Sequence, residues 1–233
     1  STVPPHCIAL WTELESTGDY DDWQIYYKDW QAPSGSGCSA FAITGGTEDE
    51  INYLPQVDIV GWSGDFSEAV IVWDSATWDD EEEEFVDYHV KWTATPEMDD
   101  EEYHVQVYDD GGWSRCSDVA CYQRTDDDQT AGEEWFVISY HQVDDPEEDW
   151  EVWAQNYSFD ANINYTEEYL TYVTSADAQW KPTTPFTGTT ICLRDPYKDV
   201  DDGAPIDETF GLAWIDRDGG DDYDVLLTRG IIP

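Results

Sequence analysis

The chain has 233 residues, of which 54 are Asp or Glu and only 9 are Lys or Arg, so its formal net charge is −45. A strongly acidic chain with few aromatic residues is expected to be disordered, but this chain contains 13 Trp, 15 Tyr and 7 Phe, enough large apolar rings for a substantial core. The scarcity of basic residues excludes the Lys and Arg clusters that direct nucleic-acid binding requires.

The acidic surface indicates a solvent of high ionic strength. An unbroken run of carboxylates, Asp79–Glu84, directly precedes a strand-like pattern. The Debye length is about 3 Å at 1 M salt, so neighbouring carboxylates hardly repel one another there. We therefore interpret the run as a solvated turn in a protein that works in multimolar salt, made by a halophile or its virus.

The apolar pattern of the sequence has period two almost everywhere. Apolar residues recur with period two in residues 85–92, a spacing that predicts a half-buried strand. The residues expected on one face are Val86, Tyr88, Val90 and Trp92. Residues 102–109 show the same alternation, with Tyr103, Val105 and Val107 on one face.

Three further segments complete the pattern. Residues 134–143 are apolar on both faces, as expected for a central strand that is covered on both sides. Residues 149–159 are rich in Trp, Tyr and Val, which favour strands. Residues 210–230 predict a hairpin around the pair Gly219–Gly220.

The resulting prediction is an all-β protein, with roughly thirteen strand candidates and no convincing amphipathic helix. A jelly-roll barrel or sandwich is the expected architecture, but one jelly roll uses about eight strands. The surplus predicts an additional small β-domain or long decorated loops on top. We assign residues 1–60 and 131–233 to the barrel and residues 61–130 to an inserted, outward-facing β subdomain.

The cysteines leave two alternatives open. Cys116 and Cys121 have neither the spacing nor the histidine partner of a zinc site, so they are either a local disulfide across a turn or two buried thiols. Cys7, Cys38 and Cys192 remain. Because the total of 5 is odd, at least one thiol is unpaired or is paired between chains.

One acidic segment resembles a calcium loop. Asp216, Asp218, Asp221 and Asp222 lie close together in the predicted last hairpin. An EF-hand needs a Glu at the twelfth position, where this chain has Leu227, so that motif is excluded. We expect at most weak, non-specific binding of Na⁺, K⁺, Mg²⁺ or Ca²⁺ there, and no other cofactor.

No motif indicates an enzyme or a small-molecule substrate. Nucleophile-elbow, metalloprotease and phosphate-loop patterns are missing from the sequence, and with 54 acids any carboxylate spacing occurs, so spacing does not indicate a hydrolase. Two glycosylation sequons occur, at Asn156 and Asn164, and Asn164 is the better candidate. No apolar run is long enough to insert into a membrane as a helix.

Two segments carry a resemblance, "STVPPHCIALW" at residues 1–11 and "GLAWIDRDGG" at residues 211–220. Together with the acidity, the Trp content and the β pattern, they make the chain resemble the larger of the two major capsid proteins of haloarchaeal icosahedral viruses with an internal membrane. The resemblance implies a vertical single β-barrel with an extra β-domain.

The same resemblance implies a role in the capsid shell of the virion. The subunit would assemble with itself and with a smaller single-barrel partner into pseudo-hexameric capsomers, without catalysis. The shell would surround a lipid vesicle that holds double-stranded DNA, near the membrane but not inserted in it. In that setting Cys7, Cys38 and Cys192 would be candidates for an inter-subunit disulfide.

An alternative function remains open from the residues alone. A secreted or surface β-sandwich of a haloarchaeon would share this composition, and it would bind carbohydrate or form an envelope layer. Planar Trp and Tyr faces can stack on sugar rings, although most Trp here fall within strand patterns, as Trp92, Trp135 and Trp153 do.

Overall fold

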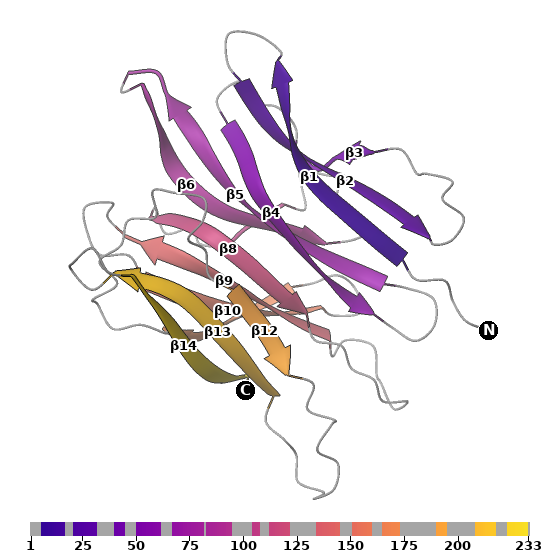
Figure 1. Ribbon diagram of the computed structural model, residues 1–233, viewed down its shortest axis with the longest axis vertical. Helices are drawn as coiled ribbons and strands as arrows, with labels where there is room; N and C mark the ends of the chain where they lie inside the picture. The colour runs from indigo at the N-terminus through magenta and orange to yellow at the C-terminus, as the bar shows by residue number, and fades with distance from the viewer. Residues whose placement is uncertain are drawn as a thin grey trace, which may run out of the picture.

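The structure is a computed structural model of the chain. It describes the backbone of residues 6–16, 21–31, 40–44, 50–61, 67–81, 83–94, 104–107, 112–121, 134–144, 151–159, 165–172, 190–194, 208–217 and 223–232. Every regular element in these residues is a β-strand, so the predicted all-β class is confirmed. The strands form four antiparallel sheets, named A to D here, and each sheet comes from one continuous stretch of the chain (Figure 1).

The strands follow one another in the order of the chain within every sheet. Sheet A contains β1 (His6–Ser16), β2 (Asp21–Gln31) and β3 (Phe41–Ala42). Sheet B contains β4 (Glu50–Gly61), β5 (Ser67–Asp79), β6 (Glu84–Ala94) and β7 (Val105–Gln106). Sheet C contains β8 (Trp113–Cys121), β9 (Glu134–Val143), β10 (Glu151–Phe159) and β11 (Tyr165–Tyr172). Sheet D contains β12 (Thr190–Arg194), β13 (Glu208–Arg217) and β14 (Tyr223–Ile232).

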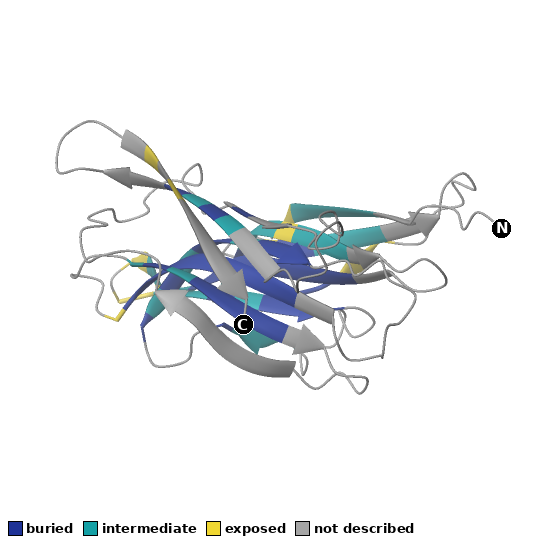
Figure 2. Cartoon of the chain, turned by 90° about the horizontal axis from the view of Figure 1, so that it is seen from below, coloured by how far each residue is buried: buried dark blue, intermediate teal, exposed yellow. Residues whose placement is uncertain are grey.

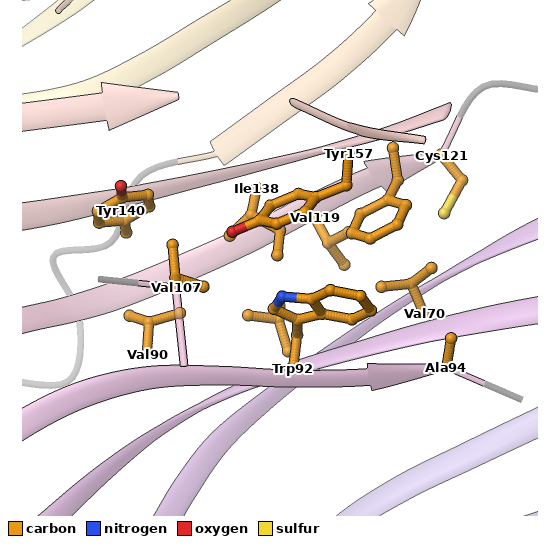
Figure 3. Close-up of a cluster of buried hydrophobic side chains, with 12 residues drawn as sticks. Val70, Val90, Trp92, Ala94, Val107, Val119, Cys121, Ile138, Tyr140 and Tyr157 are labelled. Carbon is orange, nitrogen blue, oxygen red and sulfur yellow. The ribbon is translucent and has the colours of Figure 1, made fainter. Parts of the chain in front are cut away.

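The main core lies between sheets B and C. The indole of Trp92 on β6 meets the rings of Phe136 on β9 and Tyr157 on β10, with centroid distances of 4.9 and 5.1 Å (Figure 3). Phe136 and Tyr157 in turn stack at 5.0 Å. Aromatic pairs of this kind contribute about 0.5–1.5 kcal/mol each beyond the area that they bury.

Two smaller cores attach the outer sheets. Ile25 of sheet A packs with Ile71 and Trp73 of sheet B. Val137 of sheet C packs with Leu212 and Trp214 of sheet D. The chain is therefore a stack of four layers in the order A, B, C, D, with the buried residues concentrated in the middle layers (Figure 2).

The two inner sheets contain strands that are buried on both faces. Residues 69–76 of β5 and residues 136–143 of β9 are all buried. Because successive side chains in a strand point to opposite faces, β5 contributes Ile71 to the core with sheet A and Val72 to the core with sheet C. The prediction that residues 134–143 form a central, doubly covered strand is confirmed.

The jelly-roll topology is not confirmed. A jelly roll is built from Greek keys, which pair strands that are distant in the chain, whereas each strand pair that the structure describes joins consecutive strands. Sheets B and C enclose the main core as a two-sheet sandwich, and the remaining strands form the outer sheets A and D. The predicted division at residues 61 and 130 stays a prediction, and the pairs β4–β5 and β8–β9 cross these two boundaries.

Candidate functional site

The first strands of successive sheets lie against one another. β1 contacts β4, β4 contacts β8, and β8 contacts β12. β4, β8 and β12 are also the terminal strands in the described pairing of their sheets. A terminal strand presents backbone N–H groups that no neighbouring strand accepts, so these groups need other acceptors if they are covered.

Asp58 of β4 supplies one such acceptor. Its Oδ1 accepts the N–H of the next residue, Ile59, at 2.8 Å, and its Oδ2 accepts the N–H of Cys121 of β8 at 2.7 Å. The carboxylate thus links the edge of sheet B to the edge of sheet C.

Asp118 of β8 repeats this arrangement one layer further on. Its Oδ1 accepts the N–H of Val119 at 2.9 Å, and its Oδ2 accepts the N–H of Ile191 of β12 at 3.0 Å. Hydrogen bonds from backbone N–H groups to a carboxylate are charge-assisted and stronger than neutral ones. Asp58 and Asp118 therefore join three sheets along one side of the stack.

Asp74 of β5 is a third and more deeply buried link between sheets B and C. Its Oδ2 accepts the N–H of Cys116 at 2.5 Å, and its Oδ1 accepts the N–H and the Oγ–H of Ser117 at 3.2 and 2.9 Å. Burial raises the pKa of Asp74, while these hydrogen bonds act in the opposite direction. We call Asp58, Asp74 and Asp118 the interlayer carboxylates.

Three β-bulges meet around Asp74 and its neighbour Ser75. β4 bulges next to the pair Tyr53–Asp74, and Leu54 there has φ 52°. β6 bulges next to the pair Ser75–His89, with φ 50° at Asp87.

The third bulge lies in β8, where Cys116 has φ 59°. Cys116 and Ser117 have no register partner in β9, and their N–H groups turn to Asp74 instead. A left-handed residue other than Gly costs of the order of 1 kcal/mol. The carboxylate offsets this cost by accepting both N–H groups.

Arg115 lies beside this bulge. Its guanidinium carbon is 4.0 Å from the centroid of the Tyr88 ring, and its Nη2 donates to the Tyr53 hydroxyl at 3.4 Å. Burial raises the pKa of Tyr53, and the charge of Asp74 adds to that effect. His141 of β9 is the register partner of Arg115. Burial lowers the pKa of His141 to about 4, and the charge of Arg115 adds to this effect.

The cluster is suited to holding layers together rather than to supplying a nucleophile. Burial, with the charge of Asp74 next in effect, raises the pKa of the Cys116 thiol to about 12. A thiol attacks as the thiolate, so Cys116 is unreactive near neutral pH. Both oxygens of Asp74 already accept hydrogen bonds from β8.

The sequence predicted none of the interlayer carboxylates. Among 54 acids, an Asp with a structural role has no distinguishing spacing. A usable signal exists in their neighbours, because each of the three is the only charged residue in a short segment of its strand. These segments are "VDIVG" around Asp58, "VIVWDSA" around Asp74 and "CSDVAC" around Asp118.

Of the two alternatives for Cys116 and Cys121, the structure has the buried thiols. Both lie in β8, where the sequence suggested a turn. At about 3.3 Å per residue, even a bulged strand separates them by more than the roughly 7 Å between Cα atoms that a disulfide can bridge.

The other predicted site residues are only partly within the described chain. The backbone places Cys7 in β1, Cys192 in β12 and Asp216 in β13. The remaining candidates, Cys38, Asp218, Asp221, Asp222 and Asn164, lie outside the described residues. The predicted cation site therefore stays a prediction.

Three further features of the described part of the chain bear on the predictions. Among these residues, no group of three or more His, Cys, Asp or Glu side chains is arranged to hold a metal ion. The second sequon residue, Asn156, is fully buried, so the folded chain does not expose it to glycosylation. No helix long and apolar enough to span a membrane occurs in the residues that the structure describes.

Comparisons with known proteins give no relative. No protein-family model, no curated protein and no solved structure matches the chain.

Proposed function

We propose that this chain is a structural coat subunit, the larger major capsid protein of a haloarchaeal icosahedral virus with an internal membrane. The resemblance of residues 1–11 and 211–220 suggested this role, together with assembly with itself and with a smaller single-barrel partner. The role places the chain in the capsid shell around a membrane-enclosed DNA genome, and it requires no catalysis, substrate or specific cofactor.

The observation that supports the proposal most directly is the apolar surface of both outer sheets. Val225 and Leu227 on sheet D are 69 % and 76 % exposed, and Leu14, Trp23 and Phe41 on sheet A are 41–44 % exposed. Large apolar residues that remain exposed together mark association surfaces. In a chain of net charge −45, exposed apolar residues of this kind favour the interpretation that the chain is one subunit of a larger assembly.

The acidity fits the same role. In multimolar salt the Debye length falls to about 3 Å or less, so subunits that each carry −45 charges can pack closely. The exposed carboxylates of the β5–β6 turn, among them Asp80 and Glu81, keep the outside of such a shell soluble.

The exposed apolar residues and the charge of the chain support the coat role, whereas its described topology does not support a barrel. The family fold would require a jelly-roll barrel of residues 1–60 and 131–233 with residues 61–130 above it. The consecutive pairing of the described strands does not support that arrangement. An experimental structure of the assembled particle would decide whether the barrel forms in the shell.

Sedimentation velocity of the purified chain tests the proposal. In multimolar salt, we expect assemblies larger than a dimer, alone or after addition of a smaller coat partner. Dialysis to about 0.1 M monovalent salt without divalent ions should dissociate them, because the Debye length grows to about 10 Å. A chain that stays monomeric in high salt, with and without such a partner, would contradict the coat role.

One observation favours the alternative of a carbohydrate-binding surface protein. Trp11 and Tyr26 stack at 5.9 Å with an interplanar angle of 15°, and both are only partly buried. A titration of the intrinsic fluorescence with oligosaccharides tests this function, with Trp11→Ala as the control. Saturable quenching that the variant lacks would favour carbohydrate binding over the coat role.

A further inference from the structure

The two margins of sheet D differ in what covers them. At one margin, β12 lies against β8, and Asp118 accepts the N–H of Ile191. At the other margin, β14 is the outermost strand of the layer (Figure 1). Among the strands that the structure describes, β14 pairs with β13 alone, over all ten of its residues. Its second side therefore presents backbone groups that no described strand pairs.

β14 lacks the features that protect other terminal strands of this fold from pairing. β3 and β7 contain two residues each, β11 pairs through a bulge, and β1 carries the exposed carboxylate of Glu13. β14 instead has ten residues in unbroken register, and its central residues 225–228, "VLLT", include neither a charged residue nor Pro. Long, regular and apolar edge strands of this kind pair with strands of other chains.

The most exposed large apolar residues in the described part of the chain lie at the centre of this strand. They are Val225 and Leu227. Leu227 pairs with Ala213, whose neighbours Leu212 and Trp214 pack on sheet C. Because side chains alternate along a strand, Val225 and Leu227 share the face of sheet D that points away from sheet C. Apolar residues that remain exposed together mark association surfaces.

We propose that β14 pairs antiparallel with β14 of a second copy of this chain, with Val225 of each copy opposite Leu227 of the other. A two-fold axis perpendicular to the sheet relates the two strands, so each residue stays on its own face. The contact is isologous, the kind that closes a dimer. It joins two three-stranded sheets into one sheet of six strands, which is a common size, whereas three strands form a small sheet.

Two copies of β14 suit each other as partners. Both have the same length and the same uncharged centre, so each exposed apolar side chain of one copy meets one of the other, and such cross-strand pairs stabilise antiparallel strands. Hydrogen bonds between neutral backbone groups depend little on ionic strength, whereas surface ion pairs are screened, so the contact suits multimolar salt. This inference rests on the proposed function and deepens it by naming a contact between coat subunits.

Two single cysteine variants test the pairing and its register. Under mild oxidation in multimolar salt, an equimolar mixture of Val225→Cys and Leu227→Cys should give disulfide-linked dimers on a non-reducing gel. Directly opposite Cα atoms are about 4.5–5.5 Å apart, within the reach of a disulfide. Each variant alone places its new cysteines only diagonally, at about 7–8 Å, and should give no more dimer than the wild type, which reports the background from the native cysteines.

A charge at the edge should break the contact. Leu227→Lys adds the kind of residue that natural edge strands use against pairing, and we expect the dissociation constant from sedimentation equilibrium to rise about tenfold or more. Gln56→Lys, at an exposed strand position of sheet B, is the matched control, and tryptophan fluorescence establishes that each variant is folded. Amide hydrogen exchange of residues 223–232 should slow as the wild-type concentration rises through its dissociation constant, but not in Leu227→Lys.

The outcomes separate this inference from the coat role. A wild type that associates while the cysteine mixture gives no cross-linked dimer, or while Leu227→Lys and Gln56→Lys associate equally, would overturn the β14 contact and leave the coat role standing. Cross-linking of either cysteine variant alone would overturn the stated register. Slower exchange in β14 only after addition of a smaller coat partner would overturn the second copy as the occupant. A wild type that never associates, even with such a partner, would contradict both proposals.

Discussion

Asp118 of β8 accepts the backbone N–H of Ile191 of β12 at 3.0 Å and so joins sheet C to sheet D. Asp58 makes the same link one layer earlier, to Cys121. These carboxylates satisfy N–H groups on strands that would otherwise be open edges, and open edges invite pairing with other chains. Part of the acidity of this chain therefore has a structural role.

Substitution of Asp118 tests that link. Asp118→Asn removes the charge and one of the two acceptor oxygens, so we expect the hydrogen bond to Ile191 to weaken by about 1–3 kcal/mol. Amide hydrogen exchange of residues 190–194 should then accelerate about tenfold or more, because local opening of β12 becomes easier. The control is Asp80→Asn on the exposed turn, and equal exchange rates in the two variants would contradict the link.

Substitution of Asp74 should have a larger effect. Asp74→Ala leaves the buried N–H groups of Cys116 and Ser117 without their acceptor, and each such group costs about 1–3 kcal/mol. We expect the free energy of unfolding to fall by about 3 kcal/mol or more, measured by denaturant titration in high salt. A loss no greater than that of Asp80→Ala, about 0.5 kcal/mol for an exposed site, would show that the bulge in β8 does not depend on Asp74.

Acidification should lower the free energy of unfolding, because His141 binds a proton less readily in the folded chain than in the unfolded chain. Its pKa is lowered from 6.5 to about 4 in the folded chain, so between these values the unfolded chain binds a proton that the folded chain does not. The contribution of His141 to the free energy of unfolding is fully present above pH 6.5. It is lost as the pH falls toward 4, by up to about 3 kcal/mol. The shift of Asp74 has the opposite sign, because a raised carboxyl pKa favours the folded state as the pH falls.

A variant isolates the histidine from the many carboxylates. His141→Gln should flatten the dependence of the free energy of unfolding on pH between 4 and 6.5 relative to the wild type. His89→Gln, at a half-buried position of β6, is the control. Parallel pH profiles for wild type and His141→Gln would mean that His141 is not buried in the neutral form.

The thiol of Cys116 should resist modification in the folded chain. Its pKa of about 12 leaves almost no thiolate near neutral pH, and the residue is buried. Iodoacetamide labelling followed by peptide mass spectrometry should therefore label Cys116 in guanidinium but hardly at all in native, high-salt buffer. Rapid native labelling would mean that β8 opens easily or that the contact with Asp74 is not formed.

Local patterns in the sequence predicted individual strands well. The doubly apolar residues 134–143 became β9, residues 149–159 contain β10 (Glu151–Phe159), and the hairpin over 210–230 became the pair β13–β14. Alternation and composition carry this information because they act within one strand. Of residues 102–109, the structure describes a strand only at Val105–Gln106.

The bulges and the layer order could not be predicted in the same way. The sequence placed Val86 on one face with Val90 and Trp92. The bulge at Asp87 shifts the register, so Val86 pairs with Thr77 while Val90 pairs with Asp74, and Val86 falls on the opposite face. A bulge, like the contact of Asp118 with Ile191, depends on groups that are distant in the chain, and a period-two pattern contains no information about them.

The most direct test of the coat role is sedimentation of the native protein from its source culture in high salt after nuclease treatment. The proposal predicts that the chain migrates with nuclease-protected DNA in one dense, lipid-containing band. A monomer or small oligomer near the top of the gradient, free of DNA and lipid, would contradict it.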